Sequence, residues 1–93
     1  MLTDRDNARM RKRLDFKPAL AKTIKLKGDS GVLLETLEDV AKFIGAMKPY
    51  QQTRPYWDRC AREILKAARS GKRVDIMEAS RRLEIALRRD NLL

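Results

Sequence analysis

The sequence predicts an α+β fold in which a basic N-terminal arm precedes one β-hairpin and three α-helices, the last two forming an antiparallel pair. Three observations lead to this prediction. Apolar and polar residues alternate beside a glycine-rich turn at residues 28–31, which is the period of β-strands. Further along, apolar residues recur every three or four positions, which is the period of amphipathic helices. The last two helical segments carry alanines seven residues apart, a spacing that favours close helix packing.

The 93 residues suffice for one domain, and we divide them into a basic arm at 1–19 and a single α+β domain at 20–93. The chain has 22 Lys and Arg against 13 Asp and Glu, a formal charge of +9. Residues 1–27 hold nine bases and three acids, whereas residues 28–93 hold thirteen and ten. A basic segment ahead of a nearly balanced body predicts attraction to an anionic partner.

The arm contains the basic run RMRKR at residues 9–13. Met10 and Leu14 lie one helical turn apart, but an isolated helix of this length is marginal in water. Pro18 ends any such helix. We therefore expect the arm to be partly helical or disordered, with these candidate contacts for an anionic partner: Arg9, Arg11, Lys12 and Arg13.

Two short strands are expected around the glycine turn. In residues 20–27, Ile24 and Leu26 point to one face and lysines to the other. Residues 32–35 then read as the return strand. Because two strands alone are marginally stable, the hairpin must lie on helices or join another sheet.

The first helix is expected to begin at the capping box of residues 36–39, with Thr36 as the cap, and to stop before Pro49. Residues 48–55 read as a linker with two prolines. Thr53 is the expected cap of the second helix, which Gly71 ends. The buried face of this second helix should comprise Trp57, Ala61, Ile64 and Ala68, widened by Tyr56, Cys60 and Leu65.

The third helix is expected to begin with Asp75 as its cap and to end near Asp90. Its apolar face should comprise Ile76, Ala79, Leu83, Ala86 and Leu87. Trp57 is interpreted as a core residue, although an exposed aromatic residue could also anchor a partner.

The composition argues against several chemistries. The chain has no histidine and a single cysteine, Cys60, so a zinc finger, an internal disulfide and a Cys–His pair cannot form within one chain. We expect no catalytic residue, cofactor, metal site or small-molecule substrate, and we expect the protein not to be an enzyme. The sequence also lacks an apolar run long enough for a membrane span and a signal-peptide core, which predicts a cytoplasmic protein that does not bind membranes.

A second basic feature lies on the predicted second helix, at residues spaced 3, 4 and 3 apart. This stripe is a candidate for phosphate contacts, or it is a solvated face neutralised by Asp58 and Glu63. The arginines of the last helix allow the same two interpretations. A helix-turn-helix reader remains an alternative, with Met77, Ser80, Arg81 and Glu84 facing a groove. The stripe consists of Arg59, Arg62, Lys66 and Arg69.

The order of elements over residues 20–91 resembles a small bacterial family, the domain of unknown function number 982. The residues that carry the resemblance are Pro49, Tyr56, Gly71, Ala79, Leu83 and Ala86. Lys48 stands where the family has tryptophan, and Cys60 does not fall at the family's cysteine. The resemblance implies a β-hairpin followed by helices, and it implies no activity or site.

Together these observations predict a non-enzymatic binding or regulatory module that acts through association with another protein or with itself. The alternative is a nucleic-acid-binding protein that uses the arm and the Arg59–Arg69 stripe.

Overall fold

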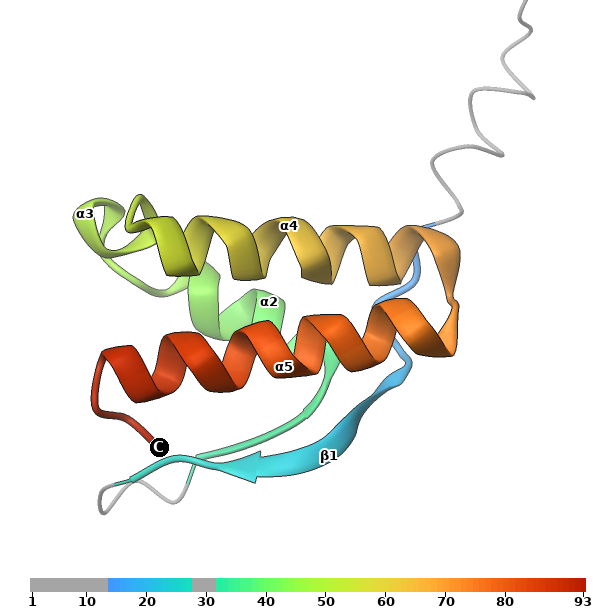
Figure 1. Cartoon of the computed structure of the whole chain (residues 1–93), viewed down its shortest axis with the longest axis horizontal. Helices are drawn as coiled ribbons and strands as arrows, with labels where there is room; N and C mark the ends of the chain where they lie inside the picture. The colour runs from blue at the N-terminus through green and yellow to red at the C-terminus, as the bar shows by residue number, and fades with distance from the viewer. Residues whose placement is uncertain (1–13, 28–31) are drawn as a thin grey trace, which may run out of the picture.

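A computed structural model describes residues 14–27 and 32–93 of the chain. Helices α4 and α5 run antiparallel side by side, and the hairpin lies below them (Figure 1). The elements in order are β1 (Ala19–Lys25), β2 (Leu33–Thr36), α2 (Leu37–Gly45), α3 (Pro49–Gln52), α4 (Pro55–Ser70) and α5 (Arg73–Arg89). The predicted α+β class, the hairpin and the antiparallel helix pair are confirmed. The predicted arm contacts Arg9, Arg11, Lys12 and Arg13 lie outside the described residues.

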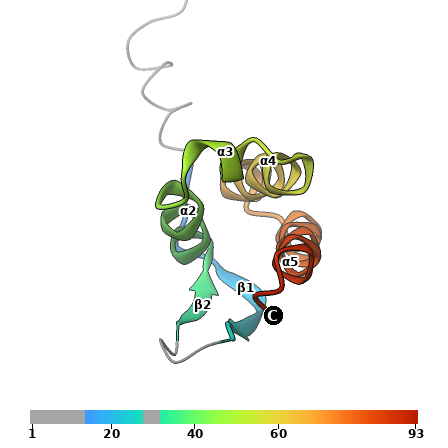
Figure 2. The same cartoon turned by 90° about the vertical axis from the view of Figure 1, so that its left-hand side faces the viewer.

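The core lies between α2 on one side, α4 and α5 on the other, and the hairpin at the base (Figure 2). Trp57 is 0% exposed and packs at a tilt against Phe43, with ring centroids 5.9 Å apart. The interpretation of Trp57 as a core residue is therefore confirmed. The expectation for Leu65 was wrong, because its side chain is 46% exposed, while Ala67 on the same helix is fully buried.

The hairpin pairs Ile24 with Leu34 and Lys25 with Leu33 in an antiparallel register, with an irregularity between Ala19 and Ile24. The buried side chains of β1 and of the residues after it face the helices, as the alternation predicted. They are Leu20, Ile24 and Leu26. Ser80 of α5 attaches the strand directly. Its buried hydroxyl accepts a hydrogen bond from the Ala21 N–H at 3.0 Å and donates to the Ile76 carbonyl at 2.9 Å.

The start of α2 follows the predicted capping box. The Asp39 N–H donates to Thr36 Oγ1 at 3.2 Å, and the Asp39 carboxylate accepts from the Thr36 N–H at 3.1 Å. A further hydrogen bond comes from the Glu35 N–H at 2.9 Å. These backbone N–H groups, with Glu35 the largest contributor, lower the pKa of Asp39 below its usual value.

Two expected helix caps were wrong. Thr53 does not cap α4; its hydroxyl donates to the Tyr50 carbonyl at 3.1 Å and it ends α3, a single turn that forms within the predicted linker. Asp75 lies inside the first turn of α5, which begins at Arg73. The Asp75 carboxylate accepts a hydrogen bond from the Ser70 hydroxyl across the turn, at 2.5 Å. Asp75 therefore does not cap its own helix.

Both long helices end with a residue in the left-handed conformation. Gly71 has φ 66° at the end of α4, as its position predicted. Asn91 has φ 59° after α5. There the N–H groups of Asn91 and Leu92 bond the carbonyls of Arg88 and Leu87 at 3.0 and 2.8 Å, which is a Schellman motif.

The described part of the N-terminal segment is joined to the domain. The Asp15 N–H donates to the Ala68 carbonyl of α4, and the Phe16 carbonyl accepts from Glu38 of α2, both at 2.9 Å. Of the chain's charged residues, 17 of the 22 bases and 10 of the 13 acids lie at 14–27 and 32–93, so these ranges hold +7 of the formal +9. The folded part of the chain is therefore strongly cationic itself.

Asp90, one residue beyond α5, connects the end of that helix to the start of α4. Its carboxylate accepts hydrogen bonds from the Trp57 indole at 2.7 Å and from the Tyr56 hydroxyl, and it pairs with Arg54 at 2.9 Å. Burial alone would raise the pKa of Asp90. The hydrogen bonds from Tyr56 and Trp57 and the charge of Arg54 outweigh burial, so its pKa lies below the usual value.

We expect Asp90→Asn to lower the free energy of unfolding at pH 7 by about 1–3 kcal/mol, because the amide cannot replace a charged acceptor of three donors. The depressed pKa means that this stabilisation is present above about pH 4 and is lost as the pH falls further. Urea unfolding of both proteins between pH 2 and pH 7, followed by Trp57 fluorescence, measures the effect. The two stabilities should converge in acid.

Glu38→Gln is the control, because Glu38 forms an exposed pair with Lys42. Its stability should stay close to that of the wild type. An Asp90→Asn curve parallel to the wild-type curve down to pH 2 would contradict the role given to the carboxylate.

Candidate functional site

The four predicted stripe residues lie on the outer face of α4, but they are not equally available. Arg59 pairs with Glu63 at 3.3 Å and Arg62 with Asp58 at 3.1 Å, both one turn apart. Lys66 reaches Asp75 of α5 at 3.9 Å. Among the residues described, Arg69 is the stripe member for which no acidic partner is found. The ion pairs match the solvated-face interpretation better than a continuous row of phosphate contacts.

One of the four residues that the helix-turn-helix alternative places in a DNA groove is not available for DNA binding. Ser80 is 2% exposed and binds the backbone of β1, so it cannot face a DNA groove. Helix α5 also packs along the length of α4 rather than crossing it (Figure 1).

An apolar groove runs between α2 and α4. Its volume is about 230 Å³, and its lining contains no charged residue. Phe16 belongs to its lining, and Leu65, 46% exposed, lies on the α4 side. The lining residues are Phe16, Ala41, Ile44, Gly45, Ala61, Ile64 and Leu65. Ala61, expected at the contact between the last two helices, lies in this groove instead.

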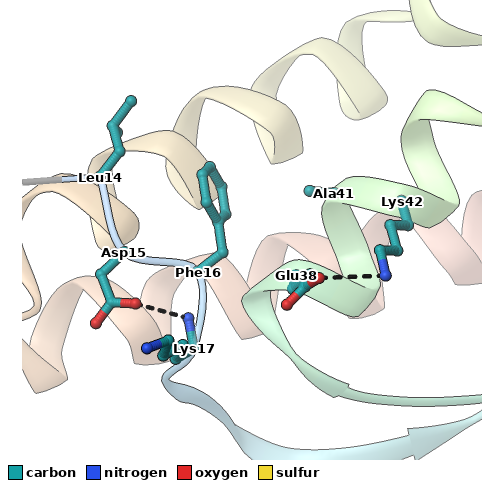
Figure 3. A pocket seen from close by; sticks show the side chains of 7 residues that line it. All are labelled: Leu14, Asp15, Phe16, Lys17, Glu38, Ala41 and Lys42. Carbon is teal, nitrogen blue, oxygen red and sulfur yellow. Dashed lines mark hydrogen bonds and ion pairs between the residues drawn. The ribbon is translucent and has the colours of Figure 1, made fainter. Parts of the chain in front are cut away.

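A second hollow of about 490 Å³, which includes charged side chains, adjoins the apolar groove, since Phe16 and Ala41 line both. Figure 3 shows Leu14 and the Phe16 ring on one side of this hollow and the Glu38–Lys42 pair on the other. Leu14 is 40% exposed. The apolar groove is therefore continued by a hollow whose lining includes charged side chains.

A basic groove of about 480 Å³ lies along the opposite side of α4, between α4 and α5. Arg59 belongs to it, together with two arginines of α5. Its lining is Pro55, Tyr56, Arg59, Arg82, Ile85 and Arg89. The arginines of the last helix are interpreted from the sequence as anion contacts or as a solvated face, and Arg82 and Arg89 are not among the predicted candidate contacts. Their spacing of seven combined with the antiparallel pairing was the signal that would have placed them beside Tyr56.

Cys60 has the environment of a core residue. It is 0% exposed, and burial, together with the nearby charge of Glu63, raises the pKa of its thiol to about 12. A thiol with this pKa stays protonated at neutral pH and is a poor nucleophile. Within residues 14–27 and 32–93, no three His, Cys, Asp or Glu side chains are grouped so as to hold a metal ion. None of the described helices combines the length and apolar character needed to cross a bilayer.

Comparisons with protein-family models, with curated proteins and with solved structures give no match to this chain. The resemblance to the domain of unknown function number 982 stays a prediction. A function for this protein must therefore be argued from the arrangement of its own surface residues.

The burial of Cys60 yields a direct prediction. In the native protein at pH 8, its reaction with a disulfide reagent such as DTNB should be at least about 100-fold slower than in 8 M urea, because reaction requires exposure of a thiolate. Absorbance at 412 nm follows the rate. Fast native labelling that matches the urea rate would show that the core around Cys60 opens readily.

Proposed function

We propose that the protein is a non-enzymatic binding module that holds an acidic protein partner in the groove between α2 and α4. The observation that carries the proposal is the apolar lining of this groove beside the half-exposed Leu65. Apolar surface that remains open to water at a concave site gains free energy when a partner covers it.

The lining of the groove suits an inserted helix or extended segment. Three of its lining residues are alanine or glycine, namely Ala41, Gly45 and Ala61, and small side chains let a partner's backbone approach closely. Phe16 and Leu65 add larger apolar side chains to the lining. Such a segment would bury the kind of apolar side chains that anchor helix-in-groove complexes.

Charge selects the kind of partner. The described residues carry +7, so two copies of the chain repel one another, whereas an acidic protein is attracted. We therefore favour a different, acidic protein over self-association. The nucleic-acid alternative is less well supported, because carboxylates beside Arg59, Arg62 and Lys66 offset most of the positive charge of the stripe.

The experiment uses Leu65→Asp, with Met77→Asp as the matched control, because Met77 is similarly exposed at 52% but lies on α5. Each full-length variant, with its fold checked by circular dichroism, is used to capture proteins from the cells that make it. The captured protein is then purified and titrated by calorimetry at 50 and 300 mM NaCl. We expect Leu65→Asp to weaken binding at least about tenfold, since it removes apolar contact and brings a carboxylate toward an acidic partner.

The control should bind like the wild type, and binding should weaken at the higher salt concentration. Three results would overturn the proposal: equal binding by Leu65→Asp, capture that nuclease abolishes, or sedimentation showing that the wild type dimerises at micromolar concentration. Failure to capture any partner that survives purification counts against it as well.

A further inference from the structure

The basic groove between α4 and α5 carries a second inference, independent of the proposed protein partner. We propose that this groove binds a small phosphate ester through Arg59, Arg82 and Arg89, with the organic part of the ligand against Tyr56 and Ile85. The volume of about 480 Å³ falls within the range typical of small-molecule sites. The arginines come from two different helices, so their positions depend on the fold rather than on a local run of charge.

The ion pairs of Arg59 and Arg82 orient these side chains without using up their donors. Arg59 donates from Nε to Glu63 at 3.3 Å, and Arg82 donates from Nε to Glu78 at 2.9 Å. In both, the terminal Nη groups make no hydrogen bond to another residue in the described part of the chain. An arginine held at Nε presents its two outer nitrogens as a fork, which matches the oxygens of a phosphate group.

Arg89 supplies the third charge. Its guanidinium lies over the ring of Tyr56, 5.8 Å from the centroid, and it has no acidic partner at residues 14–27 or 32–93. The Tyr56 hydroxyl is fixed by Asp90, so the ring is a rigid support for this arginine. Three arginines face two glutamates here, which leaves one net positive charge in the groove.

Glu78, the partner of Arg82, is charged at neutral pH. The hydrogen bond from Arg82 is the largest cause of a lowered pKa at Glu78, and the pair persists well below pH 7. The donors that remain for a ligand are thus the Nη groups of Arg59 and Arg82 and the guanidinium of Arg89. The two nonpolar walls, Tyr56 and Ile85, favour a phosphate attached to a planar or apolar group over a free phosphate ion.

The test titrates the full chain with inorganic pyrophosphate, with ADP and with adenosine in 100 mM NaCl, and follows the arginine Nε–Hε signals by NMR. We expect saturable shifts of Arg59, Arg82 and Arg89 with pyrophosphate, tighter binding of ADP, and no binding of adenosine alone. Equal affinity for pyrophosphate and ADP would remove the role given to Tyr56 and Ile85.

Four variants that each remove one positive charge distinguish binding in this groove from general attraction of an anion to a cationic protein. Arg82→Gln and Arg89→Gln should each weaken pyrophosphate binding at least about tenfold, since each removes a charge-assisted contact. Arg62→Gln and Arg88→Gln, which remove the same charge outside the groove, should change it less than about twofold. Equal weakening by all four variants, or shifts that fail to saturate by 10 mM, would overturn the proposal.

The two proposals fail separately. Leu65→Asp lies in the groove on the other side of α4, so it should leave pyrophosphate binding unchanged even where it abolishes binding of the protein partner. Loss of pyrophosphate binding in that variant would contradict the assignment of the phosphate site to the groove between α4 and α5.

Discussion

Asp90 supplies the interaction on which the arrangement of the helices depends. Its carboxylate lies just beyond α5 but takes its hydrogen bonds and its countercharge from Arg54, Tyr56 and Trp57 at the start of α4. A carboxylate that is only 10% exposed needs such donors, because an unpaired buried charge costs on the order of several kcal/mol. The donors can reach it only when the end of α5 lies beside the start of α4. The network therefore specifies the antiparallel register of the pair.

The other contacts of the helix pair extend this constraint to the rest of the molecule. At the far end, the Ser70 hydroxyl binds Asp75 across the Gly71 turn, so the two helices are joined at both ends. Between the ends, Ser80 attaches β1 to α5. The hairpin is marginal by itself, and this contact together with the buried apolar face of β1 provides the support that two strands need. The surfaces on the two sides of α4 are consequently framed by fixed elements, and this is a requirement for a preformed site.

The sequence predicted those features whose cause lies within a few residues. The capping box at Thr36, the left-handed Gly71 and the alternation at Ile24 and Leu26 each depend on near neighbours or on a simple period, and each is present. The two wrong caps involve competing partners nearby, since the Thr53 hydroxyl donates to the Tyr50 carbonyl and the Asp75 carboxylate accepts from Ser70. Asp75 has the spacing of a helix cap, but a serine beyond the turn takes its carboxylate. Local spacing could not reveal that Asp90 binds residues 33 to 36 positions away, because this contact exists only after the helices pair.

For the candidate sites too, the sequence predicted the spacing of charged residues along a helix but not which atoms of each side chain pair in the fold. Counting charges along α4 identified a stripe, yet the ion pairs leave its members with different capacities to bind an anion. What decides the capacity of an arginine is which nitrogens its partner occupies. Arg59 and Arg82 give Nε to a glutamate and, within the described part of the chain, make no hydrogen bond through their outer nitrogens, whereas Arg54 directs Nη1 into the carboxylate of Asp90. The first two are suited to recognition and the third to structure, although all three carry the same charge. Net charge therefore predicts an attraction to anions, whereas the paired geometry together with a place in the groove between α4 and α5 distinguishes the arginines that can act on it.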